Sequence, residues 1–206
     1  MKRDDKHIYL ASRSPRRREL LKQVGMNFEV VLYREYLARG ADVDESPHPG
    51  EPPGEYVKRI VRAKAEAGWS SIIRRRLRHF PVLAADTTVA LGGKIIGKPE
   101  NREHAVRILQ ELSGQIHQVL TAVAVKLEDR LELRLSVTSV RFRELKDQEI
   151  LNYVATGEPL DKAGGYAIQG LAAAFIAEID GSYSGIMGLP LFETAELMKE
   201  FGYQVL

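Results

Sequence analysis

Two features of the sequence predict an α/β fold. Strand-like and helix-like patterns alternate along the first half of the chain, and two long alternating segments, 115–127 and 131–143, follow them. Because only residues 128–130 separate these segments, they predict a long antiparallel hairpin. A length of 206 residues, 44% of them hydrophobic, predicts a single domain over residues 1–206, or one core with a smaller lobe beside a cleft.

The first predicted elements are a strand, a loop and a helix. IYLAS (8–12) is typical of the end of a buried strand. Ser14 suits a helix N-cap and Pro15 suits the first helical position, so three consecutive arginines, residues 16–18, fall in the first turn. Each positive charge there costs roughly 0.3–1 kcal/mol, unless a bound polyanion reverses the penalty. The segment predicts either a phosphate-binding turn or a solvated surface.

The remaining elements follow from hydrophobic periodicity and from helix-capping residues. Further strands are expected at 28–32, 81–86 and 174–179, and further helices from about residue 54, after Asn101, at 146–156 and at 190–201. Residues 33–53, rich in proline and charge, are expected to form an exposed loop.

Lys64 lies on the apolar face of the helix that starts near residue 54. A lysine at the edge of such a face usually extends its ammonium to solvent, and spacing alone favours that interpretation over a cation directed into a site. At the end of this helix, SSIIRRRLRH (70–79) favours a solvated helix end over a nucleic-acid patch. A net charge of +2 is too small to indicate general nucleic-acid binding.

Asp86 is the strongest candidate carboxylate because it is expected to end the strand at 81–86, where α/β proteins place ligand sites. It could hold a hard metal or accept a proton from water, or it could serve only to form a turn. Residues 92–98 match the first seven positions of a phosphate-binding P-loop, but Pro99 stands where Ser or Thr is required. This segment is therefore expected to form a tight hairpin around Gly92–Gly93.

The segment EPLDKAGGYAIQG (158–170) is dense in charged residues and glycines and contains Gln169. A side-chain amide can read a base edge, although a glycine-rich turn would explain the same residues. His117 is expected to be a packed or hydrogen-bonded histidine, because the five histidines show no metal-like spacing.

Several classes are excluded or disfavoured by composition. The chain has no cysteine, which excludes disulfides, thiolate metal sites and a cysteine nucleophile. It shows no apolar run of the roughly 20 residues needed to cross a bilayer, and its first residues lack the apolar core of a signal peptide. A cytoplasmic protein without membrane contact is expected.

Taken together, LASRSPRRRELL, YVKRIVRAKA, LAADT, GKPENREHA, LSGQIHQVLTAV, EPLDKAGGYAIQG and GLPLFET resemble the Maf family, in that family's order, from about residue 8 to 201. The resemblance implies a Maf/ITPase-like fold with a mixed, twisted central sheet flanked by helices. It also implies a metal-dependent pyrophosphatase that cuts a nucleoside triphosphate to the monophosphate and pyrophosphate. The IQG form around Gln169 is similar to the dTTP/UTP branch of the family, whereas the 7-methyl-GTP branch typically carries a glutamate variant.

The resemblance also implies roles for individual residues. Ser14, Arg16 and Arg17 correspond to the phosphate-binding turn, and Lys64 and Lys98 to two further cationic positions. Asp86 matches the catalytic carboxylate that acts as a general base or through a metal. Arg16, Thr87 and Gln169 match positions associated with substrate choice.

A second acidic residue follows the second strand in this family, but residues 33–41 here look like an insertion. Glu45, in VDES (43–46), is the natural match, with Asp44 as the alternative. Asp86 and Glu45 are then the expected ligands of Mg²⁺ or Mn²⁺. The expected partner is a nucleoside triphosphate, and a homodimer is plausible. The alternative functions are a nucleotide-binding regulator of cell division and a pyrophosphatase of another base preference.

Overall fold

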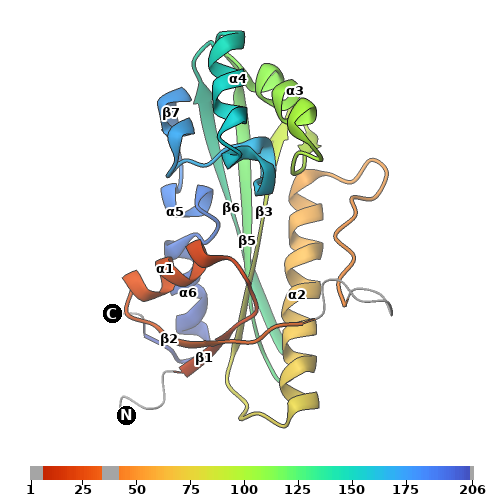
Figure 1. Ribbon diagram of the computed structural model, residues 1–206. Coiled ribbons are helices and arrows are strands. Elements are labelled where there is room, and N and C mark those ends of the chain that lie inside the picture. The colour runs from red at the N-terminus through yellow and green to blue at the C-terminus, as the bar shows by residue number, and fades with distance from the viewer. Residues whose placement is uncertain (1–6, 34–41, 205–206) are drawn as a thin grey trace.

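The computed structural model describes residues 7–33 and 42–204. A seven-stranded sheet forms its centre, in the order β2-β1-β3-β5-β6-β7 with β4 paired to β3 (Figure 1). The strands are β1 (His7–Leu10), β2 (Asn27–Val30), β3 (Val82–Leu91), β4 (Lys94–Ile96), β5 (Ile116–Leu127), β6 (Arg130–Phe142) and β7 (Ile176–Asp180). β1 is parallel to β2 and β3, and the other described pairings are antiparallel. The predicted α/β class with a mixed central sheet is confirmed.

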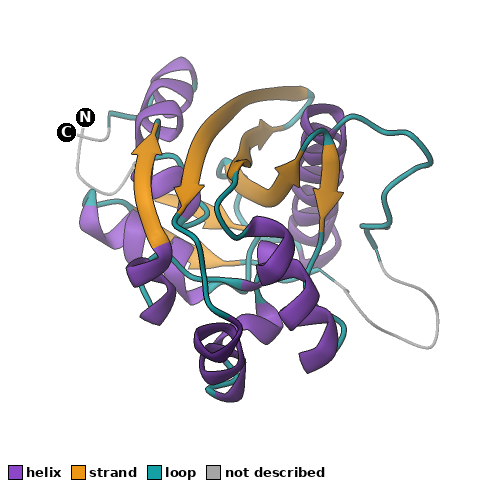
Figure 2. Cartoon of the chain, turned by 90° about the horizontal axis from the view of Figure 1, so that it is seen from above, coloured by secondary structure: helices purple, strands orange, loops and turns teal. Residues whose placement is uncertain are grey.

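Helices lie on both sides of this curved sheet (Figure 2). They are α1 (Pro15–Gln23), α2 (Pro53–Arg75), α3 (Arg102–Leu112), α4 (Asp147–Ala155), α5 (Tyr183–Ile186) and α6 (Leu191–Glu200). Three short 3-10 turns, η2 (Glu158–Asp161), η3 (Ala163–Gly165) and η4 (Leu171–Phe175), replace regular structure in the glycine-rich segment. Among the described residues, no helix is both long and apolar enough to span a membrane.

The predicted hairpin is confirmed as β5 and β6, which stay in continuous register from Ile116–Arg141 to Leu127–Arg130. The hairpin around Gly92–Gly93 is also confirmed, as the connection between β3 and β4. The strand at 81–86 was predicted too short, because β3 continues to Leu91. Thr87, Thr88 and Val89 have the branched side chains that strands favour, and all three pair with β5. Asp86 therefore lies inside a strand and not at its end.

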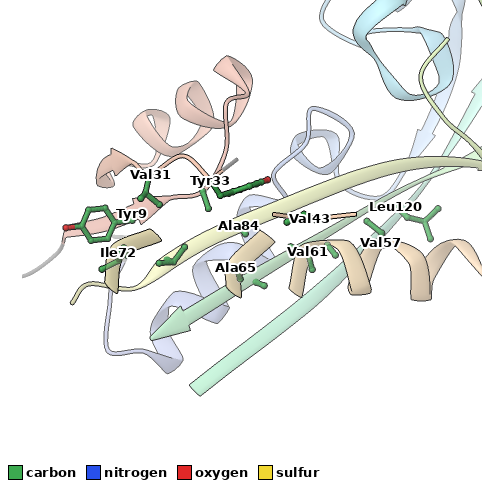
Figure 3. Packing of buried hydrophobic residues seen from close by; sticks show 14 of the residues in the cluster. Tyr9, Val31, Tyr33, Val43, Val57, Val61, Ala65, Ile72, Ala84 and Leu120 are labelled. Atoms are coloured by element: carbon green, nitrogen blue, oxygen red, sulfur yellow. The ribbon is translucent and has the colours of Figure 1, made fainter. Parts of the chain in front are cut away.

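The alternation of side chains along β3 supplies both faces of the core. Val82 and Ala84 pack on the α2 side, in one cluster with residues of that helix. Figure 3 shows Ala84 beside Val57, Val61 and Ala65. Leu83 and Ala85 pack on the opposite side, in a cluster with residues of α1 and α6. Extending this alternation places Asp86 on the α2 side and Thr87 on the α1 side.

The long helix α2 approaches the sheet closely because of Gly68. A Cβ atom at this position would lie 2.8 Å from Val82 and 2.9 Å from Ala11, so any larger residue would push the helix away. This close contact fixes the distance between the helix face that carries Lys64 and the strand that carries Asp86.

Candidate active site

A cleft of about 1040 Å³ opens at the side of the sheet where α1, α2 and β3 meet. Its walls come from segments that are distant in sequence. They include residues 12–17, 43–47, 86–89, 97–98, 161–163, 166–168 and 186–188, together with Tyr33, Tyr56 and Lys64. Eight of the nine predicted site residues line the cleft, namely Ser14, Arg16, Arg17, Glu45, Lys64, Asp86, Thr87 and Lys98; Gln169 does not.

Lys64 is the centre of the charged group in this cleft. Its Nζ atom lies 2.7 Å from Oδ1 of Asp86 and 3.0 Å from Oε1 of Glu45. The side chains of Lys64 and Asp86 are only 9% and 10% exposed, whereas that of Glu45 is 46% exposed. The interpretation of Lys64 as a snorkelling lysine, favoured from spacing, is therefore wrong.

The charge of Lys64 follows from these contacts. Burial alone would lower the pKa of the ammonium, but its electrostatic interactions with Asp86, Tyr33 and Glu45 together raise it further than burial lowers it. Lys64 therefore remains a cation and does not act as a base. Burial, followed by the charges of Asp86 and Glu45, raises the pKa of Tyr56 to about 12, so its hydroxyl stays a hydrogen-bond donor.

Arg17 uses its guanidinium to hold the opposite wall together. It donates from Nε to the Gly188 carbonyl at 2.7 Å, from NH1 to Ser12 Oγ at 3.1 Å and from NH2 to Thr87 Oγ1 at 3.3 Å. The predicted Arg17 site residue is thus placed in the cleft wall, with its donors directed at protein acceptors. Arg18, which had no predicted role, donates to the Arg13 carbonyl at 2.8 Å.

Thr87 belongs to a chain of hydroxyl groups behind this wall. Thr121 Oγ1 lies 2.7 Å from the Gly185 carbonyl and 3.0 Å from Thr87 Oγ1. Thr121 Oγ1 is the donor in both contacts, and Thr87 Oγ1 also accepts from NH2 of Arg17. The Thr87 hydroxyl accepts from both Arg17 and Thr121, so its own proton remains available as a donor.

Ser14, Arg16 and Lys98 have a different environment. Ser14 is the N-cap of α1, as predicted, but its side chain makes no capping hydrogen bond. Within residues 7–33 and 42–204, the side chains of Arg16 and Lys98 form no hydrogen bond or ion pair. These groups line the same cleft with their donors available, and the peptide N–H groups at the start of α1 lie beside them.

Asp161, Lys162 and Tyr166 also line the cleft, although the sequence assigned them no role. Lys162 donates to the Glu158 carbonyl at 2.7 Å and pairs with Asp161. Tyr166 Oη lies 2.8 Å from Nε2 of His117, which confirms a hydrogen-bonded histidine. The glycine density of this segment was the available signal, since Gly164 adopts φ +71° and its Cβ would lie 2.8 Å from Val89.

Gln169 is exposed and is not among the residues that line the cleft. Its neighbour Gly170 packs against the carboxylate of Glu158, which accepts from Tyr153 Oη at 2.9 Å and from Leu171 N at 3.2 Å. The structure therefore does not bring Gln169 together with the other predicted site residues.

The donor set of the cleft suits a hard cation. Asp86 and Glu45 direct one oxygen each at a single positive centre, the Lys64 ammonium. No group of three or more His, Cys, Asp or Glu side chains in the described parts of the chain could hold a metal by itself. Two carboxylates fit Mg²⁺ or Mn²⁺, which commonly take their other ligands from water and substrate phosphates.

The arrangement combines buried carboxylate, fixed cations and available donors in one cleft. Available cations and peptide N–H groups suit a chain of phosphates. A buried carboxylate beside them can orient water and take its proton.

Comparison with known proteins agrees with this chemistry. The sequence profile of the family described as "Maf-like protein" matches residues 7–201. A "dTTP/UTP pyrophosphatase" of Nitrosomonas europaea is 59% identical over 198 residues, which cover 96% of each chain. A protein with the same description from Aromatoleum aromaticum is 58% identical over 204 residues, which cover 98% of this chain and 99% of the relative.

Among solved structures, the Ham1 protein of Staphylococcus aureus aligns with 66% of this chain and 72% of its own at a TM-score of 0.42 and 18% identity. That similarity is too low to carry an argument. The profile match and the near full-length relatives are sufficient by themselves, and this chain belongs to the Maf-like protein family.

Proposed function

We propose that this protein hydrolyses dTTP and UTP to the nucleoside monophosphate and pyrophosphate. Two relatives with that description are 59% and 58% identical to it over nearly their whole length. The observation that carries the proposal is Lys64 held between Asp86 and Glu45, in a cleft that also exposes Arg16 and Lys98. Nucleoside triphosphates are cytoplasmic metabolites, and we place the activity there.

The residues of the cleft divide the work of the reaction. Ser14, Arg16 and Lys98 bind the triphosphate and offset the charge that develops on the departing pyrophosphate. Lys64 holds Oδ1 of Asp86, which leaves Oδ2 to accept a proton from water. The water oxygen bonds to the α-phosphorus, and the bond from that phosphorus to the bridging oxygen breaks. No protein nucleophile is required, because such reactions depend mainly on positioning and charge neutralisation.

Asp86 and Glu45 are the residues that would hold Mg²⁺ or Mn²⁺. When bound, such an ion neutralises and polarises the phosphate oxygens. Lys64 would share the two carboxylates with such an ion, and its charge holds both side chains in the cleft.

The base is read from the part of the cleft near Thr87. A hydroxyl donor there suits the O4 carbonyl that uracil and thymine share and that is an amino group in cytosine. The role predicted for Gln169 remains a prediction, because the residue lies outside the cleft lining. Gln169→Ala is expected to alter the preference among bases if that role holds, and to leave it unchanged otherwise.

A pyrophosphate-release assay tests the proposal. The protein is given dTTP, UTP, CTP, the purine triphosphates and 7-methyl-GTP, each with and without Mg²⁺ or Mn²⁺. We expect dTTP and UTP to be preferred and Asp86→Asn to lower turnover by about 10³-fold. Asp129→Asn, on the exposed turn between β5 and β6, makes the same change outside the cleft and is the control. Near-normal turnover by Asp86→Asn would reject the assignment.

A further inference from the structure

A loop of acidic residues is fastened to α2 beside the cleft. Three successive carbonyl groups, those of Asp44, Glu45 and Ser46, accept hydrogen bonds from this helix. Tyr56 Oη donates to the Glu45 carbonyl at 3.0 Å. Arg59 donates to the Asp44 carbonyl at 3.4 Å and to the Ser46 carbonyl at 2.9 Å. The backbone on either side of Glu45 is therefore held by one arginine, and Glu45 itself by a tyrosine.

The same arginine closes the far end of the loop. Arg59 meets the Glu51 carboxylate as a fork, with Nε to Oε1 and NH2 to Oε2 both at 2.7 Å. Only 10% of the Glu51 side chain is exposed, and its hydrogen bonds from Arg59 lower its pKa to about 2. His48 N also donates to Glu51 Oε2 at 3.0 Å. Residues 44–51 are thus tied at both ends to a single guanidinium group.

Contacts within the loop make it a compact unit. Ser46 N donates to Asp44 Oδ1 at 2.9 Å, and Glu51 N donates to the His48 carbonyl at 3.0 Å. The Glu45 side chain is nearly half exposed, lines the cleft and contacts Lys64 there. The position of its backbone consequently decides whether its carboxylate can reach Lys64.

We propose that Arg59, assisted by Tyr56, is a positioning residue that holds Glu45 against Lys64 and so completes the acidic side of the active site. Arg59 does not line the cleft, and it acts only through the loop. The inference rests on the proposed function for its consequence, namely the binding of a divalent cation by Glu45 and Asp86. The contacts that Arg59 and Tyr56 make with residues 44–51, which we call the clamp, can be measured without nucleotide or metal.

Hydrogen exchange of the nucleotide-free protein tests the clamp. In Arg59→Met, the amides of Ser46, His48 and Glu51 are expected to exchange about tenfold faster than in the wild type. Arg62→Met removes the same charge from an exposed position of the same helix and is expected to leave this segment unchanged. Unchanged exchange in Arg59→Met would overturn the proposal. If Arg59→Met does not fold, Arg59→Lys and Glu51→Gln are tested in its place. Each removes the two-bond contact between Arg59 and Glu51 and leaves the other residue of the pair unchanged, and the same criterion applies.

Binding of Mn²⁺ alone, followed by electron paramagnetic resonance, tests the transmission to the site. Arg59→Met and Glu45→Gln are each expected to raise the dissociation constant by about tenfold. The double variant Arg59→Met/Glu45→Gln is expected to bind no more weakly than Glu45→Gln, because the first residue acts through the second. A merely structural role for Arg59 would lower stability without this non-additivity.

The outcomes separate the clamp from the proposed function. Wild-type affinity in Arg59→Met, with weak binding in Glu45→Gln, would overturn the inference and leave the metal site intact. Additive losses in the double variant would also overturn it. A wild-type protein that binds no Mn²⁺ would reject the metal part of the proposed function, and the exchange rates would then decide the clamp by themselves.

Discussion

The cationic and hydroxyl groups of the cleft form two sets that differ in what their donor atoms contact. Arg17, Lys64 and Lys162 direct their donors at protein acceptors, and we call them the framework cations. Ser14, Arg16 and Lys98 line the same cleft with side-chain donors that no described residue accepts, and we call them the open donors. Arg16 and Arg17 are adjacent in sequence and belong to different sets.

The difference indicates how the site divides stability from binding. A buried charge needs a partner, so the framework cations are part of what holds the fold together around the cleft. If these cations had to break their contacts with protein acceptors in order to bind a ligand, the lost interaction energy would offset much of the binding energy. Open donors carry no such cost, and a triphosphate chain would satisfy them. The arginine-rich first turn of α1 therefore serves both purposes with neighbouring residues.

The largest expected effect on stability concerns the buried contact between Tyr166 and His117. Burial lowers the pKa of His117 to about 4, from an ordinary value of 6.5. The unfolded chain therefore takes up this proton more readily than the folded chain. The stability that depends on neutral His117 is complete above pH 6.5 and is lost as the pH falls toward 4. The loss amounts to roughly 3 kcal/mol.

Urea unfolding between pH 7 and pH 4 measures this loss. His117→Gln removes the titrating group, so its free energy of unfolding is expected to vary less over the same range than that of the wild type. Carboxylates that titrate in this range contribute equally to both proteins and cancel in the difference. If the free energies of unfolding of the two proteins change with pH in parallel, protonation of His117 does not contribute to the pH dependence of stability.

The next effect separates the two adjacent arginines by stability. Arg17→Met removes three hydrogen bonds and leaves the Gly188 carbonyl without its donor. We expect a loss of about 2 kcal/mol in the free energy of unfolding, because hydrogen bonds to charged groups are among the stronger ones. Arg16→Met is the matched control, one residue away on the same helix. Equal unfolding midpoints for the two variants would abolish the distinction between framework and open residues.

The sequence predicted the elements that carry the site better than it predicted the contacts within it. Helical periodicity placed Lys64 on the apolar face of α2, but its partners lie in β3 and in the loop before the helix. Local spacing contains no information on those contacts, so the lysine looked like an ordinary snorkelling residue. The resemblance to a family corrected this interpretation, and packing supplied the geometry.

Other features were beyond a local pattern for similar reasons. The apolar run at 81–86 appeared to end at a carboxylate, yet pairing with β5 continues β3 through the following threonines. The segment that holds Gln169 was identified by its amino-acid composition and its resemblance to a family motif. Neither specifies that Gln169, between η3 and η4, has an exposed side chain. The clamp made by Arg59 joins a helix to an irregular loop. The periodicity of the helix does not specify its contacts with the loop, which has no periodicity.

The smallest effect on stability, and the clearest on binding, is expected at the open donors. Arg16→Met and Lys98→Met remove charges that no described residue neutralises by an ion pair, so each is expected to change the free energy of unfolding by at most about 0.5 kcal/mol. Each is expected to raise KM for UTP by about tenfold, with a smaller change in kcat, if it contacts phosphates in the bound substrate. Raising the salt concentration is expected to weaken substrate binding in the wild type more than in these variants, because fewer exposed charges remain to be screened. Arg107→Met, an exposed position on α3 outside the cleft, controls for the change in net charge. If KM stays at the wild-type value in both variants, the triphosphate must be bound by the framework cations instead, and stability and binding would then reside in the same residues.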